Sequence, residues 1–185
     1  MLKRLSNFFY SVSTGWLTLL GLLIFVLFMI FVLPQQSQKA EAYSGGTSPD
    51  TSYFYSAGDL YQMAEAYGAD GRAAYIYARF TFDLVFPLAY LFFLTTSLSW
   101  LLARGLAETS RWRLLNLFPF AGAVFDYLEN ISTSLVLGRY PADTPVIDVL
   151  APVFTLIKWV FVNGSFVVLM IGFVLLLWRR LRKGD

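Results

Sequence analysis

The stretch Phe125-Asp126-Tyr127-Leu128-Glu129-Asn130 places two carboxylates and an amide in the middle of an apolar segment that extends from Leu114 to Leu137. Ionisable side chains within a membrane-length helix are costly, so they usually face the interior of a helix bundle and mark a site. The stretch therefore predicts an integral membrane protein in which Asp126, Glu129 and Asn130 belong to a buried polar site.

The composition of the 185-residue chain agrees with this interpretation, because 57% of its residues are hydrophobic and only 14% are charged. A transmembrane helix needs about 20 mostly apolar residues, and four segments of the chain reach that length. We therefore predict an all-α fold in which 1–185 form a single four-helix membrane bundle of up-down-up-down topology. The expected elements are membrane helices at about 14–34, 71–103, 111–137 and 146–178, an outer loop at 35–70 and a basic tail at 179–185.

The chain contains neither cysteine nor histidine. These absences exclude disulfide exchange, haem bound through histidine, the usual zinc sites and nucleophiles activated by histidine. A metal site built from carboxylates would favour magnesium, calcium or manganese. The sequence assigns no metal and no other cofactor.

The first membrane helix is expected to end at Pro34, because proline interrupts helical hydrogen bonding. Beyond it, Ala40-Glu41-Ala42 is similar to the small-x-small site at which signal peptides are cleaved. The apolar run from Trp16 to Leu33 is longer than the apolar core of a signal peptide. We therefore expect the helix to be retained as an anchor.

The outer loop is expected to contain one short helix with an amphipathic pattern. Leu60, Met63, Ala64 and Tyr67 recur at helical spacing, between a cap at Ser56 and a stop at Gly68. This helix would either lie in the membrane interface or cover the mouth of the bundle as a lid, and the pattern fits both arrangements.

Two residues are expected to shape the second membrane helix. Asp70 stands at the position of its N-terminal cap. Pro87 follows Asp83 by one turn and should kink the helix, which would free a carbonyl near that carboxylate.

Positive charges are concentrated on one side of the predicted bundle. Because such charges mark the cytoplasmic side, both termini are expected in the cytoplasm, in a multi-pass protein of the cytoplasmic membrane. Tryptophans prefer the membrane interface, and four of them are expected on the same side. The basic residues on that side are Lys3, Arg4, Arg104, Arg111, Arg113 and the tail, against Lys39, Arg72 and Arg139 on the other, and the tryptophans are Trp16, Trp100, Trp112 and Trp178.

The charged residues of the last three predicted helices fall at a similar depth. Counting about 1.5 Å per residue from the inner helix ends places them in the outer half of the bilayer. Polar stripes at matching depth on neighbouring helices are best explained if they face one another around a pocket open to the outer leaflet. Alternatively, these residues pair across helices and lock the bundle. The expected ligand-binding residues are Arg79, Asp83, Tyr90, Asp126, Glu129, Asn130, Thr133 and Lys158.

Three functions fit this pocket. The first, which we expect, is binding of a lipid-like or amphiphilic small molecule. The second is an acid–base enzyme, an isomerase, lyase or hydrolase acting on a lipid-like substrate, with Asp126 and Glu129 as catalytic candidates. The third is an accessory or oligomerising subunit whose charges pair with a partner helix. A proton- or ion-coupled transporter is less favoured, since four helices without an internal repeat form a poor pathway.

The partners expected from this interpretation are membrane lipids, the amphiphilic ligand and either a second copy of the chain or another membrane protein. No nucleic-acid partner is expected.

Overall fold

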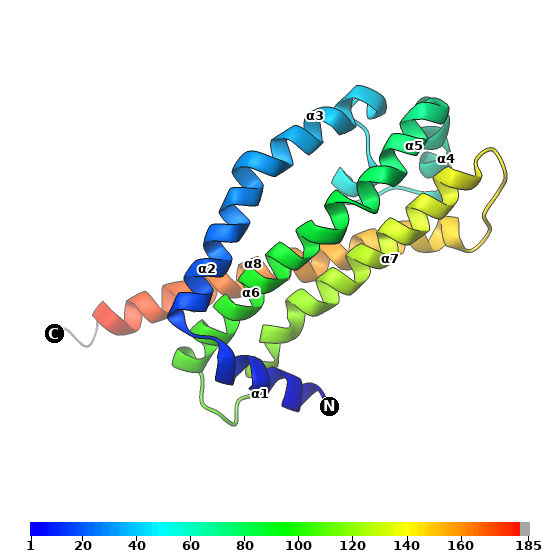
Figure 1. Cartoon of the computed structure of the whole chain (residues 1–185). Helices are drawn as coiled ribbons and strands as arrows, with labels where there is room; N and C mark the ends of the chain where they lie inside the picture. The colour runs from blue at the N-terminus through cyan, green and yellow to red at the C-terminus, as the bar shows by residue number, and fades with distance from the viewer. Residues whose placement is uncertain (182–185) are drawn as a thin grey trace.

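The computed structural model describes residues 1–181, which fold into helices without any strand (Figure 1). The last four residues of the predicted basic tail, 182–185, lie outside the described residues. In chain order the elements are α1 (Leu2–Val12), α2 (Gly15–Leu27), the π-helical turn η1 (Phe28–Val32), α3 (Leu33–Ser44), the 3₁₀ turn η2 (Pro49–Thr51), α4 (Ala57–Ala66), α5 (Gly68–Arg79), α6 (Phe82–Gly105), the 3₁₀ segment η3 (Arg111–Leu117), α7 (Phe118–Arg139) and α8 (Ile147–Leu181).

Three helical segments of the described chain are long and apolar enough to cross a membrane: Gly15–Ser44, Gly68–Gly105 and Ile147–Trp178. The predicted all-helical class is therefore confirmed, and these segments contain three of the four predicted membrane helices. The fourth is α7, which has 22 residues but is not among the three. It is more polar because Asp126, Glu129 and Asn130 lie at its centre.

The prediction that the first helix ends at Pro34 is wrong. The chain passes through the π-helical turn η1 and continues as α3 to Ser44. A proline within a helix clashes with the carbonyl four residues earlier, and the wider π turn relieves that clash. Pro34 then occupies the first turn of α3, a helix position at which proline is well tolerated. The first part of the predicted outer loop is consequently helical.

The second predicted membrane helix consists of α5 and α6, which meet at Phe80 and Thr81. Asp70 is not its cap, because it lies in the first turn of α5 and the helix start has no side-chain cap. Pro87 lies inside the continuous helix α6, so the main interruption is not at the proline. At the junction the Thr81 hydroxyl donates to the carbonyl of Tyr77 at 2.7 Å, which satisfies an acceptor near the end of α5.

The predicted short helix between Ser56 and Gly68 is confirmed by α4. The Ser56 hydroxyl accepts a hydrogen bond from the Asp59 N–H at 3.2 Å, and the Asp59 carboxylate accepts one from the Ser56 N–H at 2.8 Å. This reciprocal pair is a capping box. The apolar face of α4, which includes the fully buried Leu60, packs against α7 and α8. The helix is therefore a packed part of the fold.

The helix α7 contacts both α6 and α8, and α2 packs along α6. Two glycines allow close approaches between these helices. A Cβ atom at Gly122 of α7 would lie 2.9 Å from Val162 of α8, and one at Gly21 of α2 would lie 3.0 Å from Cα of Phe93 in α6. Small residues of this kind let helix backbones approach closely, which brings the polar face of α7 against its neighbours.

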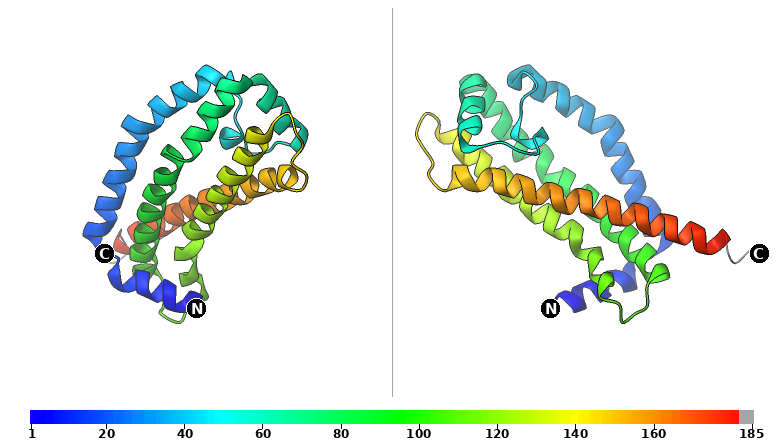
Figure 2. Two further views of the ribbon diagram at one scale, coloured as in Figure 1. Left: turned by 45° about the vertical axis from the view of Figure 1, so that its right-hand side comes forward. Right: turned by 180° about the vertical axis from the view of Figure 1, so that it is seen from behind.

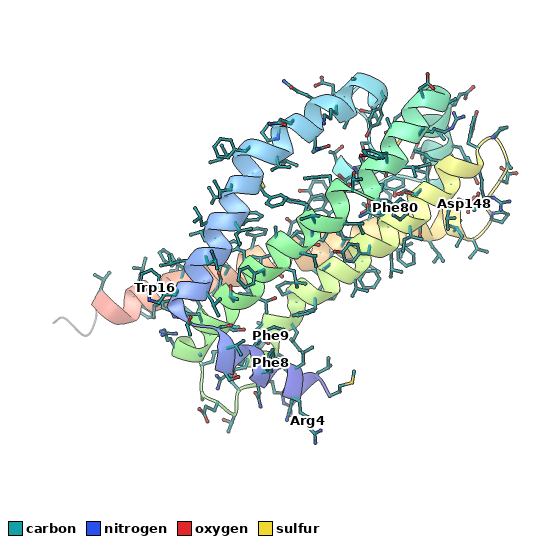
Figure 3. The ribbon with its side chains drawn as sticks, in the orientation of Figure 1. Arg4, Phe8, Phe9, Trp16, Phe80 and Asp148 are labelled. Carbon is teal, nitrogen blue, oxygen red and sulfur yellow. The ribbon has the colours of Figure 1, made fainter. Side chains whose placement is uncertain are left out.

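The N-terminal helix α1 was not predicted from the sequence. It is held by Ser6, whose hydroxyl donates to Asn116 at 2.8 Å, and by Tyr10, whose hydroxyl donates to the carbonyl of Arg113 at 2.8 Å. Figure 2 shows that α1 and the C-terminal end of α8 lie at the end of the molecule opposite α4. At this end Phe8 and Trp16 expose their rings (Figure 3).

Candidate functional site

All eight residues of the predicted site are buried, and they come from α5, α6, α7 and α8. Their relative exposure ranges from 0% for Thr133 to 7% for Asp126. The polar stripes that helical spacing predicts therefore face the interior. The eight residues are Arg79, Asp83, Tyr90, Asp126, Glu129, Asn130, Thr133 and Lys158.

Arg79 and Lys158 are the two cations of the site, and each contacts two carboxylates. The Arg79 guanidinium lies 2.8 Å from Asp83 Oδ2 through Nη2 and 3.0 Å from Asp50 Oδ2 through Nη1. The Lys158 ammonium lies 3.2 Å from Asp50 Oδ1 and also pairs with Glu129 Oε2. These contacts form one ion-pair network that connects α5, α6, α7, α8 and η2.

Asp50 joins the two halves of this network, and the sequence analysis missed it. It lies in η2, within a segment rich in turn residues. Burial opposes its ionisation, but the adjacent charges of Arg79 and Lys158 outweigh burial and hold the pKa of Asp50 below its ordinary value. Asp50 is therefore an ionised bridge between the two cations at neutral pH. The available signal was an acidic residue in the predicted outer loop, next to the outer half of the bilayer where the other charged residues are expected.

Asp126 is held by neutral donors. The Tyr90 hydroxyl donates to Asp126 Oδ2 at 2.9 Å, and the Asn130 amide donates to Asp126 Oδ1 at 3.3 Å. Thr133 lies one turn beyond Asn130 on α7, and its hydroxyl accepts a hydrogen bond from the Tyr75 hydroxyl of α5 at 3.1 Å. Asp126 therefore sits beside the ion-pair network and brings a further carboxylate to the site.

A cavity of about 830 Å³ lies beside the network, between the η1–α3 segment and the α5–α6 pair. Of the eight predicted residues, Arg79 lines this cavity, whereas Asp83, Asp126 and Glu129 do not. The expected carboxylate-lined pocket is thus a packed cluster, and the open space lies next to it. The continuation of α3 beyond Pro34 supplies one wall of that space, which is why the sequence analysis misplaced it.

The wall of the cavity changes from apolar to charged along the helices. Asp50 stands at the charged part, and its side chain is 30% exposed, whereas the side chain of Arg79 is 6% exposed. Asp50 is therefore the charged group of the network that a molecule in the cavity would meet first. The apolar part includes Phe28, Val32, Phe82 and Val85, and the charged part includes Lys39, Glu41, Asp50 and Arg79.

Comparisons of the chain with protein-family models, with curated proteins and with solved structures give no match.

Proposed function

We propose that the chain is a multi-pass protein of the cytoplasmic membrane whose four-helix bundle spans the bilayer with α2, α5–α6, α7 and α8. Three of these segments are long and apolar enough to cross it. The fourth, α7, contacts α6 and α8, so its polar face is shielded from lipid. The basic residues Lys3, Arg4 and Arg104 belong to the end opposite α4, which by the positive-inside rule is cytoplasmic.

The function we propose for this bundle is binding of an amphiphilic, lipid-like molecule in the cavity. The observation that carries this proposal is the graded wall, which runs from Phe28 and Val85 to Asp50 and Arg79. A cavity of about 830 Å³ falls within the range of about 300–1,000 Å³ that is typical of small-molecule sites. An apolar tail would pack against the phenylalanine and valine side chains, and a polar group would reach the Asp50–Arg79 pair.

The accessory-subunit and acid–base enzyme hypotheses receive less support from this geometry than ligand binding does. Arg79 and Lys158 are both paired within the chain, so neither cation needs a carboxylate from a partner helix. Asp126 and Glu129, the catalytic candidates, are buried in the network and do not line the cavity. A molecule in the cavity could not contact either carboxylate without rearrangement. Binding is therefore the function that the geometry supports best.

Filling the cavity tests the proposal. Ala74 and Ala78 of α5 line it, so the double variant Ala74→Phe/Ala78→Phe places two rings in the space. Ala69 and Ala73 lie on the same helix outside the cavity wall and are exposed, so Ala69→Phe/Ala73→Phe is a matched control. Each protein is purified in mild detergent, and the co-purifying small molecules are identified by native mass spectrometry and by lipid extraction.

The wild type and the control are expected to carry the same species, enriched over the bulk membrane extract, and the cavity variant is expected to lose it. Equal retention by the two double variants would contradict binding at this cavity. A wild-type protein without any enriched species would contradict the function itself.

A further inference from the structure

The buried site contains more acidic than basic side chains. Its four carboxylates are Asp50, Asp83, Asp126 and Glu129, and its two cations are Arg79 and Lys158. Uncompensated charge in a low-dielectric interior is strongly unfavourable. One bound divalent cation would balance the formal charge of the site.

Three of the carboxylates are close enough to share such an ion. One oxygen each from Asp50, Asp126 and Glu129 lie within 4.8 Å of one another. Asp126 and Glu129 lie on one face of α7, one turn apart, and η2 brings Asp50 to that face. Oxygen ligands in this number and arrangement suit hard cations such as magnesium, manganese or calcium.

Two unpartnered atoms at the same place point independently to a missing ligand. Among the residues that the structure describes, Glu129 Oε1 and Asn130 Oδ1 have no hydrogen-bond partner, and their residues are only 1% and 3% exposed. The amide of Asn130 donates to Asp126 through its nitrogen, so the amide group lies beside one of the three carboxylates. Buried acceptors are almost always satisfied in folded proteins, because an unmade bond costs free energy.

We propose that Asp50, Asp126 and Glu129 bind one divalent metal ion, with Asn130 Oδ1 as a fourth oxygen ligand. Lys158 contacts Glu129 through Oε2, which leaves Oε1 free for the metal. A carboxylate oxygen has two lone pairs, so an Asp50 oxygen can bind the ion and keep its cation. The partly exposed Asp50 side chain lines the cavity, so one of the proposed ligands is accessible from it.

The metal site goes beyond the proposed binding function and is tested separately, with manganese as the probe. The full chain is purified in detergent, stripped with EDTA and titrated with Mn²⁺, while the free ion is measured by electron paramagnetic resonance. The variants are Asp126→Asn, Glu129→Gln and Asn130→Asp. Asp143→Asn is the control, because Asp143 is exposed in the turn between α7 and α8.

The wild type and the Asp143→Asn control are expected to bind one Mn²⁺ per chain, which magnesium or calcium displaces. Asp126→Asn and Glu129→Gln should weaken binding by at least about tenfold, since loss of even an outer-shell partner has an effect of that size. Asn130→Asp should increase the affinity of the site for Mn²⁺. The absence of saturable binding to the wild type up to about 1 mM, the weak end of calcium sites in proteins, overturns the proposal. So does binding that is unchanged in every variant that elutes as a folded species.

Where Asp126→Asn and Glu129→Gln fail to fold, the wild-type titration and Asn130→Asp decide the question. The outcome is separate from that of the cavity experiment, because Ala74 and Ala78 are not among the proposed ligands. A chain could bind the ion without an amphiphile, or the amphiphile without an ion.

Discussion

Lys158→Met removes the ammonium that connects Asp50 to Glu129 and keeps a long apolar side chain in its place. Lys158 is 3% exposed, so water cannot replace it as a partner. Asp50 keeps Arg79 after the substitution, whereas Glu129 loses its only ion-pair partner within the described residues. Removing one member of a buried ion pair costs about 3–5 kcal/mol. Each kcal/mol lowers the melting temperature of a chain of this size by about 2–4 °C, so a decrease of roughly 6–20 °C is expected.

Thermal unfolding in detergent, followed by intrinsic tryptophan fluorescence, measures this decrease. Lys3→Met is the matched control, because Lys3 is exposed on α1, and it should shift the melting temperature little. The double variant Lys158→Met/Glu129→Gln should be more stable than Lys158→Met alone, because it removes the stranded carboxylate together with its partner. The reasoning is refuted if Lys158→Met behaves like the control. It is also refuted if the two single losses simply add in the double variant.

Two further substitutions test the helix contacts and the cap of α4. Gly122→Ala would place a Cβ atom 2.9 Å from Val162, so it should cost about 1–3 kcal/mol by overpacking and lower the melting temperature. Gly105→Ala, which meets no atom within 4 Å, should lower it less. Ser56→Ala removes the capping box of α4 and should also lower the melting temperature. Hydrogen bonds from Ser56 lower the pKa of Asp59, so the cap contributes fully above the ordinary pKa of 3.8 and is lost as the pH falls through the lowered value. The difference between wild type and Ser56→Ala should therefore shrink in melts recorded at about pH 3.

The inward faces of α7 and α8 could be predicted from the sequence because the physical constraint is simple. Charged side chains such as Asp126, Glu129 and Lys158 cannot face hydrocarbon cheaply, so helical spacing decides which other residues share their face. The side chains that each of these residues contacts follow less directly from the sequence. Spacing places Arg79 and Asp83 one turn apart on one face, and the structure confirms their contact, but it says nothing about contacts between helices that are distant in sequence.

The role of Asp50 and the helix α1 were not predicted from the sequence, for different physical reasons. Asp50 lies in a turn without periodicity, and an aspartate after Pro49 is by default a surface residue. Only the tertiary fold brings it between Arg79 and Lys158. The helix α1 is short, and its stability comes from tertiary contacts such as those of Ser6 and Tyr10.

The error at Pro34 and the omission of Asp50 concern the same place in the molecule. The helix that continues through η1 forms one wall of the cavity, and the turn that carries Asp50 closes its charged part. Asp50 also bridges the two cations, so a ligand bound in the cavity through this carboxylate would change its contacts with Arg79 and Lys158. Occupancy of the cavity by the proposed ligand and stability of the ion-pair network would therefore be thermodynamically linked through one side chain. Binding in the cavity would then affect the buried Glu129 of α7 through Asp50 and Lys158, although Glu129 does not line the cavity.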